Sequence, residues 1–194
     1  PPGSGKSMAA MRLPSILPSL SREAALETTR IYSLAGKLPR HTGLLTAPPF
    51  RKPHHTASRE GIIGGGSALQ PGEVSLAHNG LLLLDEAAEF GASVLQALRE
   101  PVEQRRVDLV RAGHRAWFPA RFQLVLTLNP CPCGNLGKED AVCLCTEREI
   151  YRYWRNLGGA LLDRIDIRLP VRPVDPLSLI GGKRRSSETL AAEV

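Results

Sequence analysis

The stretch that most constrains the fold of this 194-residue chain is its first seven residues, PPGSGKS. They match seven of the eight positions of the phosphate-loop pattern GxxxxGK[ST], and only the leading glycine is absent. Such a loop joins a strand to a helix in an α/β fold. The alternative interpretation is a chance Gly/Ser-rich loop that precedes a helix.

The pattern predicts a role for each residue from Gly3 to Ser7. Backbone N–H groups around Gly3, Ser4 and Gly5 would face phosphate oxygens, because glycine lets the chain turn inward at these positions. Lys6 would reach the β- and γ-phosphates of ATP, and the hydroxyl of Ser7 would bind Mg²⁺. The sequence therefore predicts a site for ATP and Mg²⁺.

A second motif, GLLLLDEAAEF, predicts a buried strand of a parallel sheet over 81–84, followed by two acids. Asp85 is placed to bind Mg²⁺ through water, and Glu86 to polarise an attacking water molecule. This acid pair favours hydrolysis over transfer to a substrate hydroxyl. Alone, it is equally typical of a strand end that meets solvent. Together with Lys6 and Ser7 it indicates ATPase chemistry.

The spacing of the two motifs predicts an additional strand between them. Lys6 and Asp85 lie 79 residues apart, whereas one strand-helix-strand unit needs about 30 residues. We therefore expect the strands of the two motifs to be separated by at least one further strand with insertions.

Two later residues are candidates for positions near the γ-phosphate. Asn129 ends the predicted strand 122–128, and ligands of open α/β sheets bind at the carboxyl ends of strands. Its alternative is an ordinary turn-forming asparagine before Pro130. Arg164, in LLDRID, precedes a predicted strand over 165–169. In a monomer it would form a surface ion pair of little energetic value, whereas in a ring it could reach a neighbour's γ-phosphate.

The remaining periodicities predict the other elements of the fold. Helices are expected at 6–12, 21–36, 93–99 and 146–157, with Pro14 ending the first and Pro101 stopping the third. Residues 40–72 are rich in proline and glycine and are predicted to be loop-like, and the presence of short strands within them stays open. A hairpin is expected between 106–111 and 115–118, and the first turns of a helix over 186–194.

The four cysteines form a local cluster in which two C-x-C pairs are separated by nine residues. They are Cys131, Cys133, Cys143 and Cys145. Four thiolates suit a closed, structural zinc site, and free thiols or a redox pair are the alternative. Adjacent residues of an extended segment point opposite ways, so His54 and His55 are not expected to share a metal ion, and their role stays open.

Charge and hydropathy add weaker constraints. The net charge of +6 permits contact with nucleic acid, although a charge of this size also serves solubility. No apolar run reaches the 18 or more residues that a membrane helix needs, so we expect a cytoplasmic protein with no membrane partner.

These motifs, in this order, resemble the AAA+ ATPases of the magnesium-chelatase-like group, and most closely its ComM/YifB branch. The resemblance extends to PFRKPHHTAS, PGEVSLAHNGLLLLDEAAEF and LREPVEQRRVDLVRAGHRAWFPARFQLVLTLNPCPCG. It implies a P-loop NTPase fold: a three-layer α/β sandwich with a mainly parallel sheet and a β-hairpin insertion before the first sensor. It further implies a Walker A loop at Gly3 to Ser7, a Walker B pair at Asp85 and Glu86, a first sensor at Asn129 and an arginine finger at Arg164.

The resemblance also implies a homo-oligomeric ring, expected to be a hexamer, that performs helicase or branch-migration work on DNA. In related rings the hairpin faces the central pore, where Arg111, His114 and Arg115 would touch a phosphate backbone. A solvated hairpin or a subunit contact is the alternative for each of the three. Two other functions stay open: a chelatase-type remodelling ATPase that supports metal insertion, and a module that binds nucleotide or zinc without turnover.

The same resemblance divides the chain into an ATPase core over 1–173 and a linker with the start of a helical lid over 174–194. It places a strand before Pro1, beside 165–169, and the second sensor beyond Val194. We therefore expect the full-length protein to hydrolyse ATP, and these 194 residues alone to bind it weakly.

Overall fold

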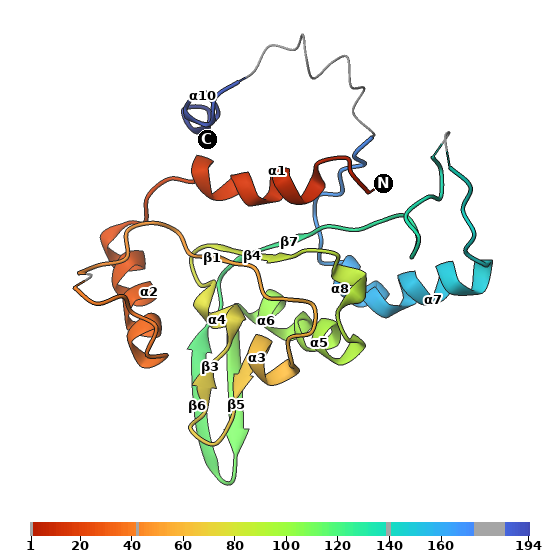
Figure 1. The fold of residues 1–194 in the computed structure, drawn as a ribbon. Coiled ribbons are helices and arrows are strands. Elements are labelled where there is room, and N and C mark those ends of the chain that lie inside the picture. Colours follow the sequence, from red (N-terminus) through yellow and green to blue (C-terminus); the bar gives the residue numbers. More distant parts are fainter. Residues whose placement is uncertain (1, 42, 139–140, 173–184) are drawn as a thin grey trace.

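A three-stranded parallel sheet lies at the centre of the computed structural model, which describes residues 2–41, 43–138, 141–172 and 185–194 (Figure 1). Its strands are β1 (Phe50–Arg51), β4 (Leu81–Leu84) and β7 (Gln123–Leu126), in the order β1-β4-β7. The leucines of β4 are buried on both faces, as the apolar run predicted. The position of β1 confirms that a further strand lies between the two motifs.

Helices cover both faces of the sheet (Figure 1). On one side lies α1 (Lys6–Arg12), followed by η1 (Leu13–Ile16), so the predicted end of the helix before Pro14 is confirmed. Four short helices cover the other side: α3 (Arg59–Ile63), α4 (Glu73–Leu76), α5 (Ala92–Ala97) and α6 (Arg99–Gln104). The predicted three-layer α/β fold is therefore confirmed. The buried side chains between sheet and helices include Ile62, Val74, Leu82, Leu84, Leu95 and Leu98.

The predicted helix 21–36 is α2 (Arg22–Leu34). Its first turn is capped by the hydroxyl of Ser21, which accepts a hydrogen bond from the N–H of Ala24 at 3.2 Å. Gly36 follows the helix with φ 65, a left-handed conformation that ends helices and favours glycine.

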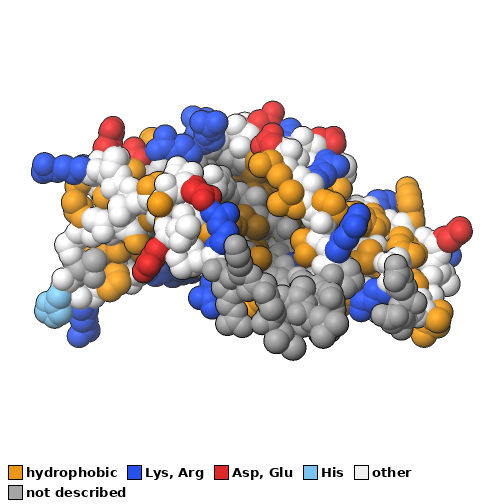
Figure 2. Space-filling view, turned by 90° about the horizontal axis from the view of Figure 1, so that it is seen from above, with side chains coloured by type: hydrophobic (Ala, Val, Ile, Leu, Met, Phe, Trp, Pro, Cys, Tyr) orange, Lys and Arg blue, Asp and Glu red, His pale blue; other side chains and the backbone are white. Residues whose placement is uncertain are grey.

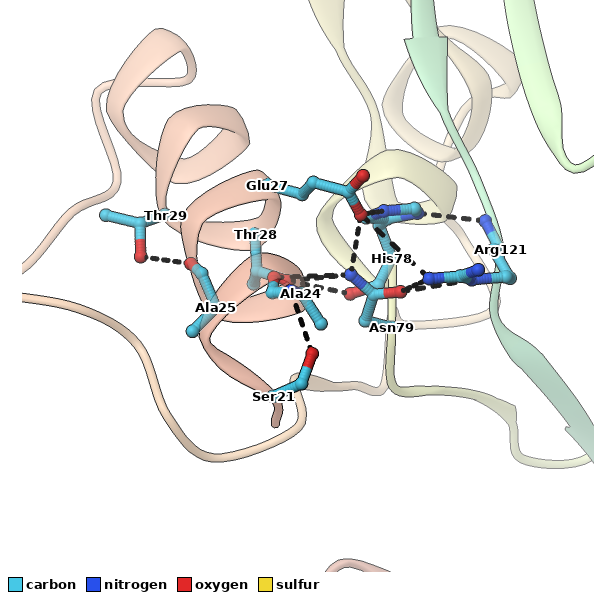
Figure 3. Close-up of polar contacts among 9 residues, drawn as sticks. All are labelled: Ser21, Ala24, Ala25, Glu27, Thr28, Thr29, His78, Asn79 and Arg121. Carbon is cyan, nitrogen blue, oxygen red and sulfur yellow. Dashed lines mark hydrogen bonds and ion pairs between the residues drawn. The ribbon is translucent and has the colours of Figure 1, made fainter. Parts of the chain in front are cut away.

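A polar network joins α2 to the residues that precede β4 and β7 (Figure 3). The side-chain amide of Asn79 donates to the carbonyl of Ala24, and its oxygen accepts from the guanidinium of Arg121 at 2.8 Å. His78 is 4% exposed, and its Nδ1 accepts the N–H of Arg121 at 3.0 Å. The proton of the neutral imidazole is therefore on Nε2, which donates to Glu27 at 3.1 Å. The network fixes the amino ends of both strands.

The segment 40–72 contains short strands, which the sequence left open, and a helix, which the sequence did not predict. Besides β1 and α3, it contains β2 (Gly64–Gly65) paired with β3 (Gln70–Pro71) in an antiparallel ribbon. A Cβ at Gly64, where φ is 111, would lie 2.6 Å from the carbonyl oxygen of Gln70. These glycines therefore allow close backbone pairing, whereas composition alone indicated a loop.

The predicted helix 93–99 is α5, which ends at Ala97, but the expectation that Pro101 stops it is wrong. Pro101 is the third residue of α6, where its missing N–H would have had no partner within the helix. The hairpin prediction is confirmed by β5 (Arg106–Arg111) and β6 (His114–Pro119). Ala112 and Gly113 form its turn with φ 47 and 82, and positive φ at both positions is what a type I′ hairpin turn requires.

The predicted strand over 122–128 is the shorter β7, and the helix 146–157 is α7 (Glu147–Leu157), which begins with a capping box between Thr146 and Glu149. α8 (Gly159–Leu162) follows it. Near the C-terminus, α10 (Ser187–Ala191) supplies the expected helical turns, and residues 174–184 of the predicted linker lie outside the described residues.

The predicted strand over 165–169 is wrong for this structure. Residues 165–172 form no strand, and the side chains of Ile167 and Leu169 are 74% and 79% exposed. Ile165 and Ile167 line a groove of about 1210 Å³ whose walls also include Gln123 and Val125 of β7. In the described part of the chain, the sheet contains only β1, β4 and β7, so the segment has no ladder partner there.

Candidate nucleotide site and cysteine cluster

The predicted phosphate loop has the backbone shape that phosphate binding needs. Gly3 and Gly5 have φ 76 and 79, a backbone conformation that residues with a Cβ rarely adopt. Ser4 is buried between them, and α1 begins at Lys6. Lys6 and Ser7 therefore follow the loop directly and lie in the first turn of α1, which packs on the sheet.

Asp85 is the centre of the site because three side chains bind its carboxylate. The hydroxyls of Ser7 and Thr127 each donate to Oδ1 at 2.6 Å, and the ammonium of Lys52 lies 2.8 Å from Oδ2. Partial burial alone would raise the pKa of the Asp85 carboxyl, but the three hydrogen bonds outweigh burial and hold it below its usual range. Asp85 therefore carries a negative charge beside the phosphate loop.

Asn129 lies next to Lys6. The ammonium of Lys6 donates to the Asn129 Oδ1 at 3.1 Å, and the N–H of Asn129 donates to the hydroxyl of Tyr153 on α7 at 3.2 Å. Burial raises the pKa of Tyr153, so its hydroxyl stays protonated at neutral pH. Lys6 and Asn129, which are far apart in sequence, are thus joined at the carboxyl end of the sheet.

Glu86 follows Asp85 in a left-handed conformation with φ 54. Its N–H donates to the hydroxyl of Thr127 at 2.8 Å, and its side chain is exposed. The backbone turn therefore directs the two acids differently, with Asp85 held in the hydrogen-bond network and Glu86 open to solvent.

The contacts of Arg164 are with helices and not with the phosphate loop. Its guanidinium donates to Glu103 on α6 at 2.6 Å and to the carbonyl of Ala160 at 2.5 Å. Its Nε is buried without a hydrogen-bond partner among the described atoms. Arg164 also lines a pocket of about 1000 Å³ beside β5, so this residue is separate from the Lys6 and Asp85 contacts within one subunit.

Sequence reasoning missed three residues of the site: Lys52, Thr127 and Tyr153. A signal existed for the first two, because Lys52 follows β1 and Thr127 follows β7, and parallel strands bring their carboxyl ends to one edge. Tyr153 is contributed by a helix, and the sequence held no signal that its hydroxyl would reach Asn129.

The four cysteines lie together, with all four sulfur atoms within 4.8 Å of one another. The Sγ of Cys131 lies 3.4 Å from that of Cys133 and 3.7 Å from that of Cys143. Sulfurs of a tetrahedral site with Zn–S bonds of about 2.3 Å are separated by about 3.8 Å. The donor set and spacing therefore fit a structural zinc ion.

The three candidate nucleic-acid contacts lie at the tip of the β5–β6 hairpin. Arg111, His114 and Arg115 are exposed, and Arg111 is paired with His114 across the ladder. His54 and His55 lie elsewhere, on the loop after β1, and the Nδ1 of His54 lies 2.8 Å from the hydroxyl of Thr56. Their ring centroids are 4.1 Å apart, so the expectation that the two side chains point opposite ways is wrong.

Comparison with known proteins shows which family combines these features. The family described as "Magnesium chelatase, subunit ChlI" matches residues 1–179. This chain belongs to that family. Two similar relatives of the ChlI-family chain are YifB of Salmonella typhimurium and the competence protein ComM of Haemophilus influenzae. The identities are 44% over a 199-residue alignment and 41% over a 198-residue alignment, and each alignment covers 100% of this chain and 38% of the relative. The ComM/YifB resemblance is therefore confirmed.

Two more distant similarities complete the comparison. A shorter alignment to DNA helicase MCM8 of Gallus gallus is 34% identical over 112 residues, and covers 58% of this chain and 12% of the helicase. Among solved structures, the complex of subunits BchI and BchD of magnesium chelatase matches with a TM-score of 0.50 and 20% identity, covering 80% of this chain and 56% of that one. This structural likeness supports the fold.

Two further findings concern the length of the ChlI-family chain and the character of its helices. The chain spans about a third of the length of the curated relatives that it matches. Among the described residues, no helix is both long and apolar enough to span a bilayer.

Proposed function

We propose that this chain is the ATP-hydrolysing AAA+ module of a ring-forming motor that acts on DNA. The observation that carries the proposal is the hydrogen bond of 2.6 Å between Ser7 and Asp85, because it joins the phosphate loop to the acid that follows β4. Membership of the ChlI family supports the ATPase class.

The phosphate loop and Asp85 have different proposed roles in binding the nucleotide. The backbone from Gly3 to Gly5 would cradle the phosphates, and Lys6 would bind the β- and γ-phosphates. Ser7 and Asp85 supply the oxygen ligands that Mg²⁺ prefers, and the bound ion would neutralise phosphate charge. Lys52 pairs with Asp85 and keeps the carboxylate ionised and ordered before Mg²⁺ arrives.

Hydrolysis needs a water molecule directed at the γ-phosphate. The exposed carboxylate of Glu86 is the proposed group that polarises this water, and Asn129, held by Lys6 and Tyr153, would orient it. Arg164 points to a different pocket, beside Glu103. We therefore propose that it acts as an arginine finger on the nucleotide of a neighbouring subunit, in a ring that we expect to be hexameric.

DNA is the substrate that we favour, for two reasons. The relative MCM8 is named a DNA helicase, and ComM is named a competence protein. Basic side chains also gather at the hairpin tip, whereas the face seen in Figure 2 carries scattered lysines and arginines among acidic and hydrophobic side chains. The alternative is a remodelling ATPase for metal insertion, since the solved structure with the matching fold belongs to magnesium chelatase.

Two further expectations belong to the same proposal. The four thiolates would hold a structural zinc ion, which would crosslink the loop. Four thiolates fill its tetrahedral coordination, so no position is left for a substrate. The protein would work in the cytoplasm, where DNA and ATP are available.

The experiment that tests the proposal measures ATP hydrolysis by the full-length protein with no nucleic acid, with single-stranded DNA and with double-stranded DNA. We expect hydrolysis that DNA stimulates. Hydrolysis without stimulation by either DNA would reject the DNA motor and favour the remodelling ATPase. Absence of hydrolysis under all three conditions would reject both and leave a binding module.

A further inference from the structure

The cysteine loop, residues 130–145 without the undescribed 139 and 140, begins directly after Asn129. Its first residues are fixed by α7, since the indole Nε1 of Trp154 donates to the carbonyl of Pro130 at 3.1 Å. The preceding residue of α7, Tyr153, binds the N–H of Asn129. The loop and the proposed water-orienting side chain therefore share one anchored stretch of backbone.

The same loop touches the phosphate loop. Gly134 has φ 76 and packs so closely against Pro2 that a Cβ at position 134 would overlap the proline ring. Pro2 is the residue before Gly3, where the proposed phosphate cradle begins. One end of the cysteine loop therefore meets Asn129, and its next turn meets the ring of Pro2, directly before the backbone that would hold the phosphates.

The cysteine loop has little else to fix its shape. In its described part it contains neither helix nor strand, and its apolar side chains Val142 and Leu144 are 76% and 86% exposed. Only Cys131 among the ligand candidates is fully buried. A metal bound by four sulfurs would replace the missing core, as structural zinc does in small domains.

We propose that the four-cysteine metal site and the nucleotide site are thermodynamically coupled through the contact of Gly134 with Pro2 and through Asn129. Zinc fixes the cysteine loop, and the fixed loop holds Asn129 and the phosphate loop in the arrangement that binds the nucleotide. Coupling between two sites is reciprocal, so bound nucleotide also retains zinc. The proposal rests on the proposed ATP site.

The test uses the full-length protein and measures the rate at which the chelator 4-(2-pyridylazo)resorcinol removes zinc, with and without saturating Mg-ADP. Nucleotide binding is measured separately by calorimetry. We expect one zinc per subunit, and release slowed at least about fivefold by Mg-ADP, the lower end of typical allosteric coupling. An equal release rate in a protein that binds Mg-ADP overturns the coupling alone. A failure to bind Mg-ADP overturns the proposed ATP site together with the coupling, and a protein without zinc overturns the metal site.

Two glycine variants separate the contact from general damage to the loop. Gly134→Ala introduces the overlap with Pro2, whereas Gly137→Ala has a nearly equal φ of 75 but no atom within 4 Å of the added Cβ. Both variants keep all four cysteines. We expect Gly134→Ala to bind zinc but to lose the effect of Mg-ADP on zinc release, and Gly137→Ala to keep that effect. Equal behaviour of the two variants overturns the role of the Pro2 contact.

Discussion

The hydroxyl of Ser7 donates a 2.6 Å hydrogen bond to Asp85, although 78 positions separate the two residues in the chain. The contact forms because α1 lies on the sheet with its first turn above the carboxyl end of β4 (Figure 1). Thr127 binds the same oxygen of Asp85 from the neighbouring strand end. The two proposed Mg²⁺ ligands are therefore already adjacent, held by side chains of this chain alone.

Thr127 is predicted to stabilise this arrangement through its hydroxyl. Thr127→Val keeps the shape but removes a donor to Asp85 and an acceptor for the N–H of Glu86. We expect the free energy of unfolding, measured with urea, to fall by about 1–3 kcal/mol, because the Asp85 carboxylate loses one of its three partners and the N–H of Glu86 loses its acceptor. Thr127→Ser keeps the hydroxyl and should be much closer to the unmodified protein. Equal stability of the valine variant and the unmodified protein would argue against this role.

Stability is also predicted to depend on pH through His78. Burial lowers the pKa of His78 from its ordinary value of 6.5, despite the opposing hydrogen bond to Glu27. Below pH 6.5 the unfolded chain therefore binds a proton that the folded chain does not, and stability is lost as pH falls. Glu27, whose pKa is also lowered, by its hydrogen bond to His78, contributes only below its ordinary value of 4.5.

The measurement compares urea unfolding at pH 7.5 and pH 5.5. One proton contributes at most about 1.4 kcal/mol per pH unit, so we expect a loss of about that size or smaller over the interval. His78→Gln should remove this part of the pH dependence, and His114→Gln, on an exposed residue, should leave it unchanged. A pH dependence that persists in His78→Gln would assign it to other groups.

Some contacts of the site could be predicted from the sequence and others could not. The contacts among Lys6, Ser7, Asp85 and Asn129 could be anticipated, because motif spacing and strand ends place side chains at one edge of a parallel sheet. The prediction of a strand over 165–169 was wrong because a strand needs a hydrogen-bonded neighbour. The alternation of side chains in the segment does not show whether such a neighbour exists. The Tyr153 hydroxyl was missed because a helix-to-strand contact depends on packing, which local periodicity does not encode.

The hairpin tip is predicted to contact the DNA backbone. Arg111→Ala with Arg115→Ala should weaken binding of single-stranded DNA and reduce the slope of log affinity against log salt by about 0.7 for each phosphate that is no longer neutralised. Arg106→Ala is the matched control, because Arg106 lies at the other end of β5 and pairs with Asp108. Fluorescence anisotropy at several salt concentrations measures both quantities. Equal slopes for the double variant and the control would remove the tip from the DNA interface.

Arg164 is predicted to act on a neighbouring subunit. Arg164→Ala subunits keep an intact nucleotide site, and Lys6→Ala subunits keep the arginine, so each is expected to be inactive alone. Mixing the two should restore part of the ATP hydrolysis, because one subunit supplies the site and the other the guanidinium. If mixtures stay as inactive as the separate variants while forming mixed rings, Arg164 does not act between subunits.

ATP hydrolysis by Glu86→Gln is the most direct test of the central claim, that this chain is the catalytic module of an ATPase. The variant keeps the size of the side chain and removes the carboxylate that would polarise water. We predict that the full-length variant binds ATP as tightly as the unmodified protein and that its kcat is lower by about 100-fold or more. An unmodified protein that binds but does not hydrolyse ATP, or an unchanged kcat in Glu86→Gln, would contradict the account.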